Sequence, residues 1–119
     1  MILLTLGDLG ALVIRRGRDS EDLPKVNDPE VRPSGQVVTS SKFYPLPVAH
    51  VAGIASVSGE GDCFAAAFIS SILRNRTQDQ AVSAGFQAAE ITLKAFEAVP
   101  KSLTGDVIDW NKSAQGKLL

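Results

Sequence analysis

Apolar runs at the start of the chain predict two short strands joined by a turn. Residues 2–6 (Ile-Leu-Leu-Thr-Leu) are almost wholly apolar, a pattern typical of a strand buried on both faces in a parallel sheet. Residues 7–10 (Gly-Asp-Leu-Gly) form a turn, and residues 11–14 (Ala-Leu-Val-Ile) form a second strand. Because a domain rarely begins inside its central sheet, this start indicates part of a larger domain.

Apolar residues at helical spacing predict two helices in the second half. In the first, about 61–74, Phe64, Phe68 and Ile72 recur every four residues. The second, about 78–98, carries a large apolar stripe and a small-residue face, with Pro100 just beyond its end. The stripe is Val82, Phe86, Ala89, Leu93 and Phe96, and the small face is Ala81, Ala84, Gly85 and Ala88.

The rest of the chain predicts one domain over residues 1–112 with an insertion and a tail. Residues 17–36 carry charges and three prolines but few large apolar side chains, which favours a flexible surface insertion. Strand character returns at 37–39 and 42–44, before prolines interrupt any ladder. Residues 113–119 are expected to fray.

Composition excludes several functional classes. The 119 residues are 45% hydrophobic with a formal net charge of −1, so charge implies neither a nucleic-acid nor a membrane partner. The apolar runs fall far short of the roughly 18 residues of a membrane span. One cysteine and one histidine cannot assemble a four-ligand zinc site, so no metal-ligating residues are assigned. The cytoplasm is the expected compartment.

The segment with the clearest chemistry is 56–64, Ser-Val-Ser-Gly-Glu-Gly-Asp-Cys-Phe, a glycine turn before an amphipathic helix. The first helical turn has backbone N–H groups without intrahelical partners, and the helix dipole adds about half a positive charge, so anions are stabilised there. Asp62 would lie in that turn, where its carboxylate could accept a hydroxyl proton. The segment therefore suits phosphoryl transfer.

The same segment has a simpler interpretation. A glycine turn followed by an aspartate at a helix start is also an ordinary capping arrangement. No Lys-Ser or Lys-Thr follows the glycines, so this is not a Walker loop. Both interpretations stay open on these residues alone.

Two motifs in the same order resemble the ribokinase (PfkB) family of carbohydrate and nucleoside kinases. Residues 56–64 align with that family's Asp-Thr-x-Gly-Ala-Gly-Asp-x-Phe signature. Residues 5–10, Thr-Leu-Gly-Asp-Leu-Gly, reproduce its upstream Thr-Leu-Gly-x-x-Gly turn. The resemblance covers nearly all of the chain except the insertion and the tail. It implies the C-terminal part of an α/β sandwich with a mostly parallel sheet flanked by helices.

The resemblance also implies roles for individual residues. Asp62 would be the catalytic base that deprotonates the acceptor, and the backbone of Gly59, Glu60 and Gly61 would form the anion hole. The implied nucleotide-binding residues are Thr5, Gly7, Gly10 and Gln87. ATP and Mg²⁺ are the implied cofactors, with a monovalent cation as a further candidate. The implied activity is ATP-dependent phosphoryl transfer to a hydroxyl of a sugar or nucleoside.

The chain departs from the family pattern at two positions and in length. Ser56 replaces the usual aspartate, and Glu60 adds a negative charge where alanine is usual. The Val-Ser-Gly-x-Gly-Asp-Cys variant is most similar to pseudouridine-kinase-like members. Complete members are longer, so the chain corresponds to a fragment with the ATP half, which could pair with the missing N-terminal half or form a homodimer. The alternative is a non-catalytic, degenerate nucleotide-binding or structural half-domain that requires a partner chain.

Overall fold

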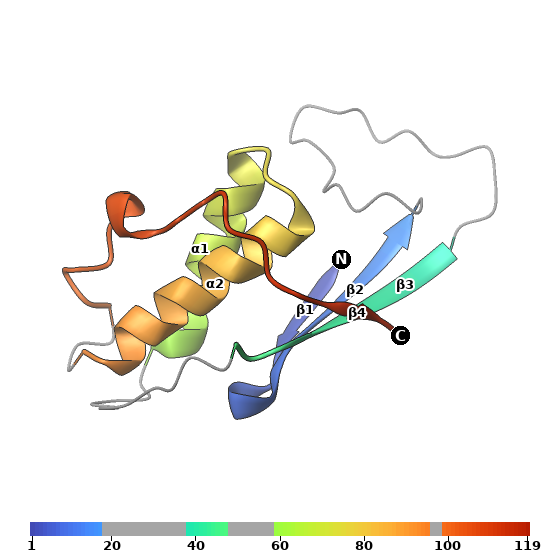
Figure 1. Ribbon diagram of the computed structural model, residues 1–119, viewed down its shortest axis with the longest axis horizontal. Helices are drawn as coiled ribbons and strands as arrows, with labels where there is room; N and C mark the ends of the chain where they lie inside the picture. Colours follow the sequence, from blue (N-terminus) through green and yellow to red (C-terminus); the bar gives the residue numbers. More distant parts are fainter. Residues whose placement is uncertain (18–37, 48–58, 96–98) are drawn as a thin grey trace.

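The computed structural model describes residues 1–17, 38–47, 59–95 and 99–119. Within these ranges, four strands form one sheet in the order β1-β2-β3-β4: β1 (Ile2–Thr5), β2 (Gly10–Gly17), β3 (Val38–Pro45) and β4 (Lys117–Leu118). Helices α1 (Glu60–Leu73) and α2 (Gln78–Leu93) lie side by side on one face of this sheet (Figure 1). The described part of the chain also contains two short 3-10 turns, η1 (Gly7–Leu9) and η2 (Gly105–Val107).

The prediction of a mostly parallel sheet is wrong for the described strands, because all three pairings are antiparallel. Only η1 and its flanking residues join β1 to β2, whereas a parallel connection needs a crossover of about a dozen residues or more. Gly10 allows this tight return: its φ is 122°, and a Cβ there would overlap the Tyr44 carbonyl oxygen. The two apolar runs therefore form a hairpin.

The strand predicted at residues 2–6 was expected to be buried on both faces, and this is also wrong for β1. Leu3 is half-buried against the core, while Ile2 and Leu4 remain 55% and 44% exposed. β1 is an edge strand, and helices cover only one face of the described sheet. A continuous apolar run in an antiparallel edge strand therefore leaves one face open to solvent.

The helix layer forms where the apolar spacing predicts it. Ala11, Val13 and Tyr44 from the sheet join the aromatic side chains of both helices in one core. The Phe64 and Phe86 rings meet edge to face at 5.4 Å between centroids. Gly85 makes this approach possible, since a Cβ there would lie 2.7 Å from the Phe64 ring. The predicted small-residue face is buried and serves close helix packing.

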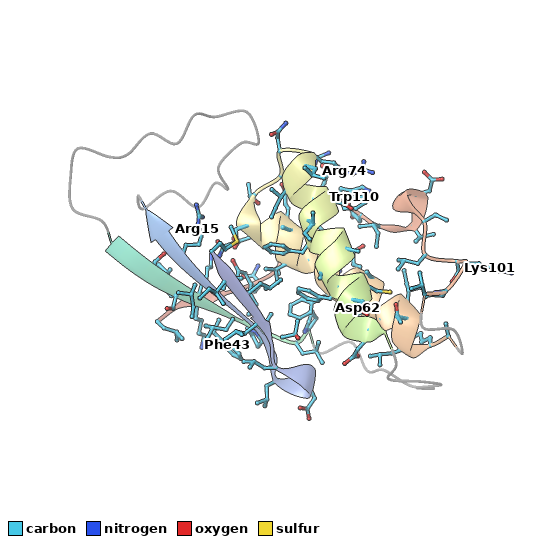
Figure 2. The ribbon with its side chains drawn as sticks, turned by 180° about the vertical axis from the view of Figure 1, so that it is seen from behind. Arg15, Phe43, Asp62, Arg74, Lys101 and Trp110 are labelled. Atoms are coloured by element: carbon cyan, nitrogen blue, oxygen red, sulfur yellow. The ribbon has the colours of Figure 1, made fainter. Side chains whose placement is uncertain are left out.

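The C-terminal segment covers the helix pair and then returns to the sheet (Figure 1). Ile108 packs against Cys63, Ala67 and the small side chains of α2 in a second core. The Arg74 guanidinium stacks 4.2 Å from the Trp110 ring centre (Figure 2). Residues 113–119 were expected to fray, but β4 pairs with β3 instead. None of the described helices has the length and apolar character needed to cross a membrane.

Candidate functional site

The first turn of α1 begins at a glycine that cannot cap it with a side chain. Gly59 occupies the N-cap with φ 81°, in the left-handed region, and its carbonyl accepts the Cys63 N–H at 3.0 Å. The N–H groups of Glu60, Gly61 and Asp62 precede this first helical bond and have no intrahelical acceptor. Their donors and the helix dipole give this end of α1 a positive potential.

The first turn of α2 is closed by its own side chains. Thr77 Oγ1 accepts the Gln80 N–H, and Gln80 Oε1 accepts the Thr77 N–H, which completes a capping box. Asp79 Oδ1 accepts the Tyr44 hydroxyl at 2.5 Å and the Lys42 ammonium at 2.9 Å. This helix end is therefore bound to the sheet.

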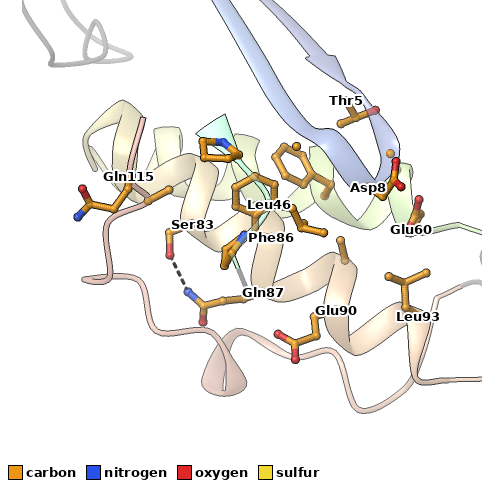
Figure 3. A pocket seen from close by; sticks show the side chains of 18 of the residues that line it. Thr5, Asp8, Leu46, Glu60, Ser83, Phe86, Gln87, Glu90, Leu93 and Gln115 are labelled. Atoms are coloured by element: carbon orange, nitrogen blue, oxygen red, sulfur yellow. Dashed lines mark hydrogen bonds between the residues drawn. The ribbon is translucent and has the colours of Figure 1, made fainter. Parts of the chain in front are cut away.

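A cavity of about 610 Å³ lies beside the start of α1. This volume is within the roughly 300–1,000 Å³ of small-molecule sites. The η1 turn, the start of α1, one face of α2, residues 45–47 and residues 112–115 line it. Figure 3 shows Thr5, Asp8 and Glu60 toward one end of the cavity and Gln115 at the other.

Six of the predicted site residues line this cavity, five of them from the two motifs and the sixth, Gln87, from α2. Thr5, Gly7 and Gly10 come from the β1–β2 hairpin, and Glu60 and Gly61 come from the start of α1. The two motifs are far apart in the sequence, and the helix packing brings them to the same space. Gly7 and Gly10 have positive φ, at 60° and 122°, a conformation that favours glycine. Because glycine has no side chain, the cavity wall at these two positions is formed by backbone atoms.

Asp62 and Gly59 are near this cavity in sequence but are not among the residues that line it. Asp62 lies in the first turn of α1 with an exposed side chain (Figure 2). A group in contact with Asp62 would therefore approach from solvent. Ser56, the departure from the family aspartate, lies outside the described residues.

Gln87 also lines the cavity, but its amide has a structural role. Its Oε1 accepts the Asp109 N–H at 2.8 Å, and its Nε2 donates to the Asp109 carbonyl at 3.0 Å. The same nitrogen donates to Ser83 Oγ at 3.2 Å (Figure 3). Gln87 thus holds the C-terminal segment against α2.

Sequence reasoning missed several walls of the cavity. Phe86 and Leu93 recur at helical spacing and were assigned to a core stripe, but both line this space. Leu46 lies between two prolines that were interpreted only as strand breakers. Lys112 gave no motif, and the chain fold alone brings it to the rim. Periodicity identifies an apolar face but cannot tell a packed neighbour from a cavity.

The charges around the cavity are unequal. Asp8, Glu60 and Glu90 supply three carboxylates, and Lys112 is the one basic side chain among the described lining residues. Within the described ranges, no group of three His, Cys, Asp or Glu residues could hold a metal ion. A polyanion bound here would therefore meet backbone donors and one ammonium against three carboxylates.

Comparison with other proteins adds no assignment. No protein-family model matches the chain, and no curated protein matches it. The resemblance to ribokinase-type kinases remains a prediction that rests on the two motifs.

Proposed function

We propose that the chain binds ATP in this cavity and belongs to a kinase of the ribokinase type, which transfers a phosphoryl group to a hydroxyl of a sugar or nucleoside. The observation that supports the proposal is the convergence of two motifs. Thr5, Gly7 and Gly10 line one cavity together with Glu60 and Gly61, although the two motifs are separated by some fifty residues of sequence.

The chemistry of the lining residues favours one orientation of the nucleotide. The apolar side chains of Leu46, Phe86 and Leu93 offer surface to a flat base. The uncapped N–H groups at the start of α1 offer donors to the phosphates. We therefore assign the base to the α2 side and the phosphates to the α1 end. Gln87 lines this cavity on α2, and its amide also holds the Asp109 backbone.

Asp62 is the proposed catalytic base. Its exposed carboxylate would accept the proton of the acceptor hydroxyl, whose oxygen then forms a bond to the γ-phosphorus of ATP. The bond from that phosphorus to the bridging oxygen of the β-phosphate breaks, and ADP leaves. Mg²⁺ would arrive with the nucleotide, because magnesium usually binds substrate phosphates and keeps several waters. Pseudouridine is the acceptor that the signature variant favours, and a cytoplasmic location suits the single cysteine.

A non-catalytic nucleotide-binding module is the second candidate. It is favoured by Glu60, whose carboxylate lines the cavity beside the proposed phosphate site and repels anions. In this case the chain would bind nucleotide weakly and would not transfer its phosphoryl group without a partner chain. The two candidates differ in turnover, not in the location of the nucleotide.

The test is calorimetric titration of the chain with a non-hydrolysable MgATP analogue, together with Glu60→Gln and Gly61→Val. Saturable binding that is lost in Gly61→Val, where a branched side chain enters the cavity wall, would support the site. No binding by a folded wild-type chain would refute it. Phosphoryl transfer to a panel of sugars and nucleosides, pseudouridine included, then separates the kinase from the non-catalytic module.

A further inference from the structure

The outer side of β1 is one of the two edges of the described sheet. No described strand pairs with this edge. The Leu6 N–H donates to the Gly10 carbonyl at 2.8 Å, so the Leu6–Gly10 pair is hydrogen-bonded. Hydrogen-bonded and non-hydrogen-bonded pairs alternate along an antiparallel ladder. The N–H and C=O groups of Leu4, two residues before Leu6, therefore also point toward β2. Leu3 and Thr5 therefore direct their N–H and C=O groups outward.

The sequence of β1 lacks the residues that usually protect an edge strand. Natural edge strands carry charged side chains, prolines or bulges that block pairing, and residues 2–5 contain no charge and no proline. The side chains of Ile2 and Leu4 project on the face away from the helices, since Leu3 on the opposite face packs into the core. On that outer face the half-buried Leu12 and Phe43 extend the apolar surface.

We propose that β1 pairs antiparallel with β1 of a second copy of this chain across a twofold axis. A strand is the partner that satisfies the outward N–H and C=O groups of Leu3 and Thr5. Two twofold registers do so, one centred on Leu3 and one on Leu4, and both place Ile2 and Leu4 of the two copies on one face. Because the strand is uncharged, self-pairing brings no like charges together within the strand.

The dimer is expected to be weak. A four-residue strand pair buries less than the roughly 1,000 Å² typical of a stable interface, so we expect a Kd above about 1 μM. Concentration is therefore the variable to control. Sedimentation equilibrium over a series up to about 1 mM would detect association of this strength.

A matched pair of substitutions locates the interface. Leu4→Lys adds a charge to the β1 edge, and Leu118→Lys makes the same change on β4, at the opposite edge, where the side chain is 72% exposed. We expect at least a tenfold increase in Kd for Leu4→Lys and less than a twofold change for Leu118→Lys. Equal weakening by both substitutions would overturn the proposal.

Amide exchange of the wild-type chain tests the pairing without any substitution. The Leu3 and Thr5 amides should exchange more slowly as concentration rises, while the Leu4 amide, already bonded to β2, should not change. A chain that stays monomeric at about 1 mM would overturn the proposal and indicate a different strand as the occupant. A dimer that leaves the Leu3 and Thr5 amides unprotected would overturn it as well.

Discussion

The N-termini of α1 and α2 lie in the same helix layer, yet their first turns are capped differently. At α2, Thr77 and Gln80 cap each other, and Asp79 binds Tyr44 and Lys42 from the sheet. At α1, Gly59 has no side chain to cap the helix, and the first turn opens on the cavity. Both first turns contain acidic residues, so charge alone does not distinguish them. The first turn of α2 has both a side-chain cap and partners from the sheet, whereas α1 has no side-chain cap and its residues Glu60 and Gly61 line the cavity. This separates a structural helix end from one available to a ligand.

The largest expected effect comes from substitution of the acidic residues in the two first turns, Asp62 in α1 and Asp79 in α2. If Asp62 is the base, Asp62→Asn should lower turnover about 10²–10⁴-fold, because asparagine cannot accept the acceptor proton. Its thermal stability should stay near that of wild type, since Asp62 is exposed. Phosphoryl-transfer kinetics and thermal unfolding measure the two quantities.

Asp79→Asn is the matched control for that prediction. It should leave turnover within a fewfold range while lowering stability, since Asp79 serves the sheet contact. Equal loss of turnover in both variants would mean that Asp62 has no special role in catalysis.

The contact of Asp79 with Tyr44 and Lys42, which we call the α2 clamp, should have the next largest effect when it is removed, a loss of stability. Asp79→Ala removes the acceptor of the Tyr44 hydroxyl and the carboxylate beside Lys42, so we expect a loss of about 1–3 kcal/mol in the free energy of unfolding. Urea denaturation would measure it. Glu90→Ala breaks an exposed i,i+4 pair with Lys94 and should cost about 0.5 kcal/mol or less. Equal costs would show that the clamp adds nothing beyond a surface pair.

The two N-cap residues should respond differently to substitution. Gly59→Ala places a side chain at φ 81° and should cost about 1–2 kcal/mol, because left-handed backbone crowds a Cβ. Gly59→Asn should cost less, since asparagine tolerates this region. Thr77→Ala should cost about 1 kcal/mol through the lost capping bond, and Thr77→Ser should restore most of it. Denaturant titration of the four variants would compare them, and a Gly59→Asn cost equal to that of alanine would contradict the backbone argument.

The smallest expected effect concerns the charge at the cavity. Glu60→Gln removes one carboxylate from the lining, and relief of about 1 kcal/mol of repulsion corresponds to roughly fivefold tighter binding of the MgATP analogue. Raised salt should shrink this difference by screening. Glu90→Gln, at another wall, serves as the comparison. Unchanged or weaker affinity for Glu60→Gln would place the phosphates away from Glu60.

Local sequence signals predicted the helices well. The first was expected at 61–74 and is Glu60–Leu73, and the second was expected from 78 and begins at Gln78. Each helix was predicted from an apolar repeat, a signal that depends only on residues within a few turns of one another. The expected end near 98 overshoots Leu93, the last residue of α2.

The sheet and the site depended on contacts that no local signal contains. An apolar run such as residues 2–5 fits a buried parallel strand or an edge strand, and only its pairing with β2 decided between them. The resemblance named Asp62 and the glycines, yet it gave no indication that Asp62 lies outside the cavity lining. Gln87 was predicted near the base and lines the cavity, and the resemblance gave no indication that its amide also binds the Asp109 backbone.

The sequence by itself determined the two helices, the capping of α2 and the glycines that let the backbone turn at residues 7, 10 and 59. These features depend on backbone sterics and on neighbours within one or two turns. Only the tertiary structure decided the antiparallel pairing, the clamp at Asp79 and the meeting of Thr5 with Glu60 around one cavity. Such features join residues distant in sequence, and their free energy comes from burial and hydrogen bonds that exist only after the helix layer packs on the sheet.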